Sequence, residues 1–153
     1  MLYLGSPMFF YGDEAGMWGA NDPDCRKPMV WADKKYDAET YNPDQSKHEP
    51  DEVIFDRDLF DWYRKFIGLR QQYKSIRLGS YTTLAIDDEK KLYAFVRKLS
   101  NEEVIVIVNR SNKPLLFTHE ALKSNKYKNL FTRLSVARQI NVNAMDVVVL
   151  GNK

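Results

Sequence analysis

Two adjacent carboxylates follow a short apolar segment near the start of the chain. Residues Pro7–Tyr11 are apolar or aromatic, and Gly12 separates them from Asp13 and Glu14. A strand that ends in polar residues before a long loop is how barrels and open α/β sheets place functional groups at their carboxyl edge. The two are a poor acid–nucleophile pair, because adjacent strand residues point to opposite faces, whereas the paired carboxyls of glycoside hydrolysis face one ring from ~5–9 Å apart. We therefore expect them to fix the strand end through hydrogen bonds or ion pairs.

A carboxylate and a guanidinium lie four residues apart in the next segment, at Asp22 and Arg26, with Pro23 between them. The carboxylate accepts hydrogen bonds and the planar guanidinium donates them in a fork, so the pair could bind neighbouring hydroxyl groups of a sugar. It could equally form a salt bridge that braces the loop. From the residue types alone, the salt bridge is the favoured interpretation, and sugar binding remains the alternative.

The remaining reactive side chains predict no catalytic residue, no metal site and no cofactor. Cys25 is the only cysteine, so it has no internal disulfide partner and no CxxC spacing. His48 and His119 each lack a second histidine at ligand spacing.

The first fifty residues have the composition of loops and the next segment that of a helix. Residues 1–50 hold five of the six prolines, and a long irregular segment in a compact protein is usually a binding loop. From Asp56, a plausible N-cap, apolar residues recur at steps of three and four, which predicts a helix over 56–75 that ends before Gly79. The apolar stripe of this helix consists of Leu59, Trp62, Tyr63, Phe66, Ile67 and Tyr73. We expect these side chains to be buried in the core rather than to form a surface on which a ligand stacks.

After Gly79 the pattern changes to short strands with polar turns, which predicts an antiparallel β-sandwich. The expected strands are Tyr81–Ile86, Leu92–Leu99, Val104–Asn109, Leu115–Thr118, Val136–Val142 and Val147–Leu150. We expect the core to include Leu92, Ala94, Val96, Ile105, Ile107, Val147 and Val149. The pattern over residues 119–135 assigns no element.

Composition excludes several classes of partner. The 153 residues carry a net charge of +2 without a basic block, so we expect no nucleic-acid partner. No run of eighteen apolar residues occurs, so we expect no membrane span. The start has no cationic region ahead of its apolar residues and does not read as a signal peptide, which leaves localisation undecided between cytoplasm and periplasm.

Three motifs together resemble a known family. They are Gly5–Met17 (GSPMFFYGDEAGM), Asn21–Arg26 (NDPDCR) and Met29–Trp31 (MVW). They resemble the end of the catalytic barrel in glycoside hydrolase family 13, the α-amylase family, and are most similar to its neopullulanases, cyclomaltodextrinases and maltogenic amylases. Residues 68–79 look like the last barrel helix, and residues 93–97 and 106–109 look like strands of the C-terminal domain.

The resemblance implies a mainly β chain in which a C-terminal antiparallel β-sandwich follows the last strand, long loop and last helix of an incomplete (β/α)8 barrel. Residues 1–79 would be the barrel end, with Pro7–Tyr11 as its eighth strand, and residues 80–153 the C-terminal domain. In the subgroup, an Asp and an Arg spaced like Asp22 and Arg26 contact glucose units of the substrate. With the family considered, substrate binding outweighs bracing for this pair.

The same resemblance implies that the catalytic carboxylates are missing. The family's nucleophile, acid and third catalytic carboxylate all lie on earlier strands, so Met1 is expected to be an internal or truncated start. We expect the C-terminal portion of a retaining glycosidase for α-glucans (maltodextrin, cyclodextrin or pullulan), inactive alone. Its partners would be an α-glucan oligosaccharide in the parent enzyme and the missing barrel or a second copy. The alternative is a non-catalytic sandwich module that binds α-glucan or docks on another chain.

Overall fold

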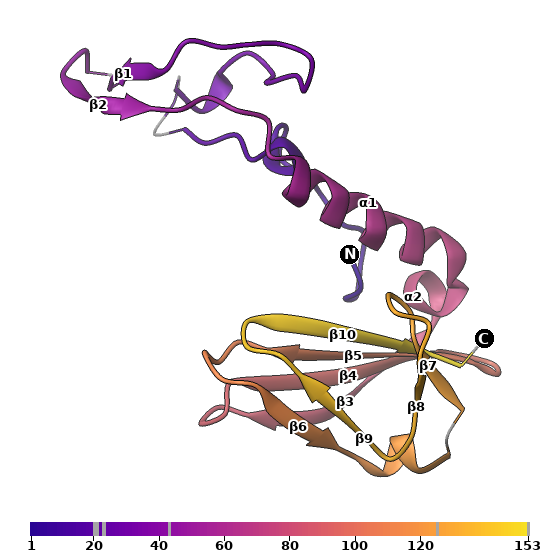
Figure 1. Ribbon diagram of the computed structural model, residues 1–153. Coiled ribbons are helices and arrows are strands. Elements are labelled where there is room, and N and C mark those ends of the chain that lie inside the picture. Colours follow the sequence, from indigo (N-terminus) through magenta and orange to yellow (C-terminus); the bar gives the residue numbers. More distant parts are fainter. Residues whose placement is uncertain (20–21, 23, 43, 125, 153) are drawn as a thin grey trace. The chain divides into compact units, whose positions relative to one another are not determined.

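The computed structural model describes residues 1–19, 22, 24–42, 44–124 and 126–152 (Figure 1). The chain divides into two compact units. The first consists of Met1–Gly5 and Leu69–Lys153, and the second of Ser6–Gly68. Among the described residues, no helix is long and apolar enough to cross a lipid bilayer.

The first unit contains two antiparallel sheets, as expected, and the mainly β fold class is confirmed. The main sheet has six strands in the order β3-β4-β5-β10-β7-β8, and β6 and β9 form the smaller sheet (Figure 1). The strands of the main sheet are β3 (Ser80–Asp87), β4 (Leu92–Leu99), β5 (Glu102–Asn109), β10 (Asp146–Gly151), β7 (Tyr127–Asn129) and β8 (Ser135–Val136). The smaller sheet pairs β6 (Leu115–Thr118) with β9 (Gln139–Val142).

The predicted strand over 136–142 is divided between the two sheets. Val136 ends β8 in the main sheet, and Gln139 begins β9 in the smaller one. Arg138 lies between them with φ 60°, in the left-handed region. This turn redirects the chain, and the apolar pattern alone does not reveal it. A 3-10 turn, η3 (Glu120–Ser124), and β7 fill part of the segment to which the sequence assigned no element.

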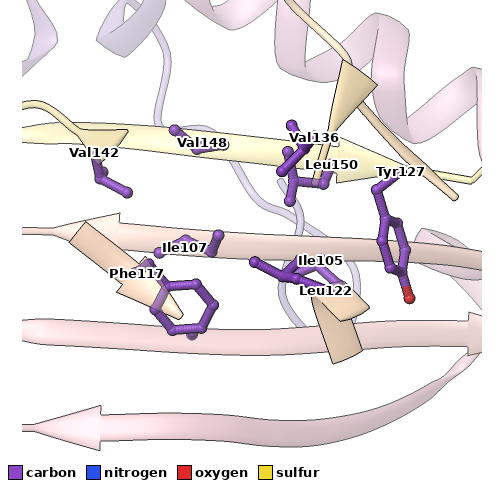
Figure 2. Close-up of a cluster of buried hydrophobic side chains, with 10 residues drawn as sticks. Ile105, Ile107, Phe117, Leu122, Tyr127, Val136, Val142, Val148 and Leu150 are labelled. Atoms are coloured by element: carbon purple, nitrogen blue, oxygen red, sulfur yellow. The ribbon is translucent and has the colours of Figure 1, made fainter. Parts of the chain in front are cut away.

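Apolar side chains of both sheets form one core (Figure 2). Its buried members are Ala94, Ile105, Ile107, Phe117, Leu122, Tyr127, Val136, Val142, Val148 and Leu150. Leu92 and Val96 pack against this cluster, so five of the predicted core residues are confirmed.

The prediction that Val147 and Val149 of β10 face the core is wrong by one position along the strand. Val148 pairs with Ile107 and Leu150 with Ile105, so these residues share the core face. Val149 is fully buried, but on the opposite face of the sheet. A strand that is apolar on both faces has no alternation from which its register can be read.

The face of the main sheet opposite the core is partly covered by α2 (Lys74–Leu78) and by the start of the chain. Ile76 of α2 is fully buried and Leu2 is almost so. Arg97 on β4, 2% exposed, donates hydrogen bonds to the carbonyl oxygens of Tyr3, Gly79 and Ser80. The N-terminal residues are thus an integral part of the first unit.

The long helix begins where predicted and ends earlier. The carboxylate of Asp56 accepts a hydrogen bond from the Leu59 amide at 2.8 Å, which confirms the N-cap of α1 (Arg57–Gln72). Tyr73 is extended, with φ −103° and ψ 109°, and separates α1 from α2. Its side chain is only 1% exposed, so burial of this ring accompanies the break. The Ser75 amide then donates to Glu102 Oε1 at 2.6 Å.

The predicted apolar stripe of α1 is buried only toward its C-terminal end. Leu69 and Tyr73 are buried, whereas Trp62 is 39% and Ile67 37% exposed. The rings of Trp62 and Phe66 stack with their centroids 5.7 Å apart. The expectation that the whole stripe is core therefore fails for Trp62 and Ile67.

The second unit is mostly irregular. It contains 3-10 turns η1 (Asp13–Ala15) and η2 (Asp24–Arg26), a hairpin of β1 (Glu39–Tyr41) and β2 (Lys47–Asp51), and most of α1. The segment Pro7–Tyr11 forms no strand ladder with any described residue. A barrel strand is hydrogen-bonded to a neighbour on each side, and such neighbours do not occur among the described residues.

Candidate functional site

The two predicted binding residues, Asp22 and Arg26, contact each other through a bidentate ion pair. Arg26 Nε lies 2.7 Å from Asp22 Oδ1, and Arg26 Nη2 lies 2.7 Å from Oδ2. The Arg26 side chain is 70% exposed and that of Asp22 is 57% exposed. Such a pair on the surface contributes only ~0–1 kcal/mol to stability. Both side chains are thus largely open to solvent, where a ligand could reach the outer edge of the ion pair.

A different residue braces this loop. The ammonium of Lys27 lies 2.7 and 2.8 Å from the two carboxylate oxygens of Glu39 on β1 and 3.5 Å from Asp24. It also lies 3.6 Å from the centroid of the Trp18 ring, a cation–π contact. The Lys27 side chain is only 21% exposed, so these contacts are better shielded from solvent than the Asp22–Arg26 pair. Lys27 thus also holds this loop, in addition to the Asp22–Arg26 salt bridge.

A pocket of about 390 Å³ lies beside this loop. Its lining includes Trp18, Lys27, Val30, Tyr36, Glu39 and Ile54. The Tyr36 hydroxyl accepts a hydrogen bond from the Trp31 amide at 2.6 Å, and the Tyr11 hydroxyl donates to the Lys27 carbonyl at 2.6 Å. These contacts tie the irregular segments of the second unit to one another around the pocket.

The adjacent carboxylates Asp13 and Glu14 lie in η1. Asp13 Oδ2 accepts a hydrogen bond from the Phe10 amide at 3.2 Å, so this side chain fixes the end of the apolar segment as expected. Gly12 and Gly16 flank the turn with φ 87° and 73°, in the left-handed region that glycine adopts without strain.

The histidines and the cysteine have ordinary surroundings. His48 Nδ1 lies 2.6 Å from the Glu49 carbonyl oxygen. His119 Nδ1 accepts from the Ala121 amide at 3.1 Å, and Cys25 is half-buried. Within the described part of the chain, no three His, Cys, Asp or Glu side chains are grouped so that they could hold a metal ion.

The sandwich contains a buried carboxylate, Glu103, that no sequence motif indicates. Lys98 Nζ lies 2.8 Å from Oε1, and Lys126 Nζ and the Tyr127 hydroxyl lie 2.5 and 2.6 Å from Oε2. Burial by itself would raise the pKa of Glu103, but the hydrogen bonds from Lys126, Lys98 and Tyr127 outweigh it and lower the pKa to about 2. Burial and this carboxylate together raise the pKa of Tyr127. No spacing in the sequence marks the cluster, because Lys98 lies on β4, Glu103 on β5, Lys126 just before β7 and Tyr127 at its start.

Part of the sandwich matches a described family. Residues 81–143 match the family "Maltogenic Amylase, C-terminal domain". The chain is 38% identical over 109 residues to neopullulanase 2 of Thermoactinomyces vulgaris, which covers 71% of this chain and 15% of that protein. It is also 38% identical over 113 residues to a cyclomaltodextrinase of Geobacillus thermopakistaniensis (strain MAS1), covering 74% and 16%. The chain thus spans about a sixth of the length of these relatives.

Solved structures give the same result for the fold. A cyclomaltodextrinase matches with a TM-score of 0.75 and 24% identity, over 99% of this chain and 24% of that one. A maltogenic amylase from S. marinus matches with a TM-score of 0.69 and 25% identity, over 97% and 17%. These matches confirm the fold, and together with the sequence matches above they confirm the resemblance inferred from the motifs.

Proposed function

Because residues 81–143 belong to the maltogenic amylase C-terminal domain family, we propose that the chain is the C-terminal portion of an α-amylase-family glycosidase that acts on α-glucans. Residues 1–79 would correspond to the end of the catalytic barrel and residues 80–153 to the C-terminal domain. The relatives are named neopullulanase and cyclomaltodextrinase and contain several times as much chain.

The observation that carries a role in substrate binding is the exposed fork of Asp22 and Arg26. Lys27 gives the loop a second set of ion pairs that is better shielded from solvent, so the loop does not rest on the Asp22–Arg26 salt bridge alone. Pairing with Asp22 already fixes the plane of the Arg26 guanidinium. Little conformational entropy is therefore lost when a ligand binds to it. Its free N–H groups can donate to vicinal hydroxyls, and the outer lone pairs of Asp22 can accept from the same sugar.

We also propose that the carboxylates needed for hydrolysis lie outside this chain, as the family resemblance implies. A retaining glycosidase uses one carboxyl as nucleophile and a second as acid, about 5–5.5 Å apart across one sugar. Asp13, the exposed candidate, already accepts a hydrogen bond from the backbone of its own turn. We therefore propose that the chain binds glucan as part of a larger active site and does not cleave it alone.

The test compares Arg26→Ala with the wild type in an enzyme in which the remaining barrel is restored, using a long and a short maltodextrin. Loss of a charge-assisted hydrogen bond, ~1.5–3 kcal/mol, should lower kcat/KM for the long substrate about ten- to hundredfold. A short substrate that never reaches this subsite should be nearly unaffected. Equal losses on both substrates would show that Arg26 acts on the loop and not on the sugar.

A second candidate function is docking on another chain that supplies the rest of the barrel. It is favoured by the exposed apolar segment before η1, where Met8 is 89%, Phe10 56% and Tyr11 45% exposed. Co-expression with a barrel lacking its last strand tests it. Restored hydrolysis that needs both chains would support docking, and two chains that never co-purify would exclude it.

A further inference from the structure

Two neighbouring cations of the second unit, Arg26 and Lys27, have opposite surroundings. Arg26 is largely exposed and pairs with Asp22, which is also exposed. Lys27 is mostly shielded from solvent and lies 2.7 Å from Glu39 Oε2 and 3.5 Å from Asp24 Oδ2. The carboxylates of Asp24 and Glu39 are themselves only 14% and 23% exposed. One cation is thus directed outward to an exposed carboxylate, and the other inward to two shielded ones.

The inward position of Lys27 is fixed from several segments. Its carbonyl oxygen accepts a hydrogen bond from the Tyr11 hydroxyl at 2.6 Å. Its ammonium lies 3.6 Å from the centroid of the Trp18 ring and within hydrogen-bond distance of both carboxylate oxygens of Glu39 on β1. All of these contacts lie within the second unit, and none of them depends on an exposed face.

The shielded carboxylates give Lys27 an effect on its neighbour. Opposite charges attract each other more strongly where water is excluded. Without the Lys27 ammonium, Asp24 and Glu39 would therefore attract another cation more strongly than the exposed Asp22 does. Arg26 is two positions from Asp24 and ends the same turn, η2. The ammonium of Lys27 thus removes the attraction that would turn the guanidinium of Arg26 inward, away from Asp22.

We propose that Lys27 is a positioning residue for substrate binding. By neutralising Asp24 and Glu39 it keeps the guanidinium of Arg26 paired with Asp22 and directed outward, where an α-glucan chain can reach it. The contact between Arg26 and glucan rests on the proposed function, whereas the effect of Lys27 on the ion pair rests on the contacts of this unit. Through Glu39, the β1–β2 hairpin then contributes to substrate binding without touching the sugar.

The first experiment follows the Nε–H signal of Arg26 in the full ¹⁵N-labelled chain. In the wild type this nitrogen lies 2.7 Å from Asp22 Oδ1, so Asp22→Ala should shift the signal strongly. In a Lys27→Met background the same change should shift it little, because the guanidinium has already left Asp22. Lys27→Arg keeps the charge and should preserve the wild-type response. Lys34→Met, at an exposed lysine 3.8 Å from Asp33, is the matched control and should also preserve it.

The second experiment measures kcat/KM for a long and a short maltodextrin in the enzyme whose barrel is restored. Lys27→Met should lower kcat/KM for the long substrate about three- to tenfold, through KM, because a displaced guanidinium loses part of a charge-assisted hydrogen bond. The short substrate should be nearly unaffected, which also shows that the active site remains folded. In an Arg26→Ala background, Lys27→Met should have no further effect on the long substrate, since the residue that it positions is gone.

The two ways of failing give different results. An equal response of the Arg26 signal to Asp22→Ala with and without Lys27 would overturn the positioning role and leave the proposed function intact. A full loss from Lys27→Met in the Arg26→Ala background would do the same, because Lys27 would then act on the loop as a whole. Equal losses for Arg26→Ala on long and short substrates would refute the binding of glucan by Arg26 and, with it, the contribution of Lys27 to binding. Lys27→Gln is a second neutral variant for every comparison if Lys27→Met folds poorly.

Discussion

Arg97 donates a hydrogen bond from Nη1 to the carbonyl oxygen of Tyr3 at 3.0 Å, across 94 positions of the sequence. The same guanidinium donates to Gly79 and Ser80, so one buried cation joins the start of the chain, the end of α2 and β3. All three of these hydrogen-bond partners are backbone carbonyl oxygens. Burial and the nearby positive charge of Arg70 lower the pKa of Arg97. The hydrogen bonds are what compensate this buried charge.

Replacing Arg97 should destabilise the first unit and release the N-terminal residues. In Arg97→Met the carbonyls of Tyr3, Gly79 and Ser80 lose their donor, which should lower the free energy of unfolding by about 1–3 kcal/mol. Urea unfolding measures this, and amide exchange of residues 2–5 should accelerate. Lys128→Met, at an exposed cation on β7, is the control. Unchanged exchange over residues 2–5 would contradict the proposed anchoring.

Ile107 is fully buried in the hydrophobic core between the sheets. Ile107→Ala should lower the free energy of unfolding by ~2–5 kcal/mol, because it removes buried methyl groups and leaves a cavity. Leu116→Ala on β6, at a side chain 54% exposed, should cost less than about 0.5 kcal/mol. Chemical denaturation of both variants decides the strand register, and equal costs would refute it.

Stability should depend on pH through Glu103. Its pKa is lowered from 4.5 to about 2 in the folded protein, so its stabilising effect is present above about pH 4.5. It is lost as pH falls toward 2, because the unfolded chain binds the proton first. The free energy of unfolding of wild type should exceed that of Glu103→Gln by ~2 kcal/mol near neutral pH, and the difference should shrink toward pH 2. A pH-independent difference would refute the role of the charge.

The purified chain should release no reducing sugar from maltodextrin, cyclodextrin or pullulan. The acid and nucleophile that hydrolysis needs are expected on strands that this chain does not contain. A reducing-sugar assay at high protein concentration tests the prediction. Sustained release that disappears in Asp13→Asn or Glu14→Gln would overturn it.

The exposed apolar residues before η1 should promote self-association. Met8 and Phe10 are 89% and 56% exposed, and such neighbouring apolar groups are usually covered in a stable protein. Sedimentation equilibrium should show a mass that rises with concentration, and Met8→Glu with Phe10→Ser should abolish the rise. A strict monomer for the wild type at every concentration would contradict this expectation.

Elements with local signals were predictable from the sequence, whereas contacts between distant residues were not. The N-cap at Asp56 and the bounds of β4 follow from residue type and alternation. The break at Tyr73 does not, since it accompanies burial of that ring and the contact between Ser75 and Glu102. The orientation of β10 was also hidden, because both of its faces are apolar.

In the candidate site, too, a local contact was predictable and the contacts between distant residues were not. A spacing of four residues suggested that Asp22 and Arg26 meet, and they do. The bracing by Lys27 depends on Glu39, which lies twelve residues away on a hairpin that proline content concealed. The Glu103 cluster likewise requires the strand order, which no local pattern specifies.

Arg70 has a consequence for engineering. Its guanidinium donates to the carbonyl oxygens of Met1 at 2.9 Å and Gly5 at 2.7 Å, so the points where the chain leaves and re-enters the first unit are joined by one side chain. The segment Ser6–Gly68 is therefore topologically an insert between adjacent anchor points. Because the entropy of closing a loop varies only slowly with its length, this insert could be exchanged for a shorter linker or a foreign segment. The sandwich would then be a scaffold that accepts a foreign segment at one position, between Gly5 and Leu69.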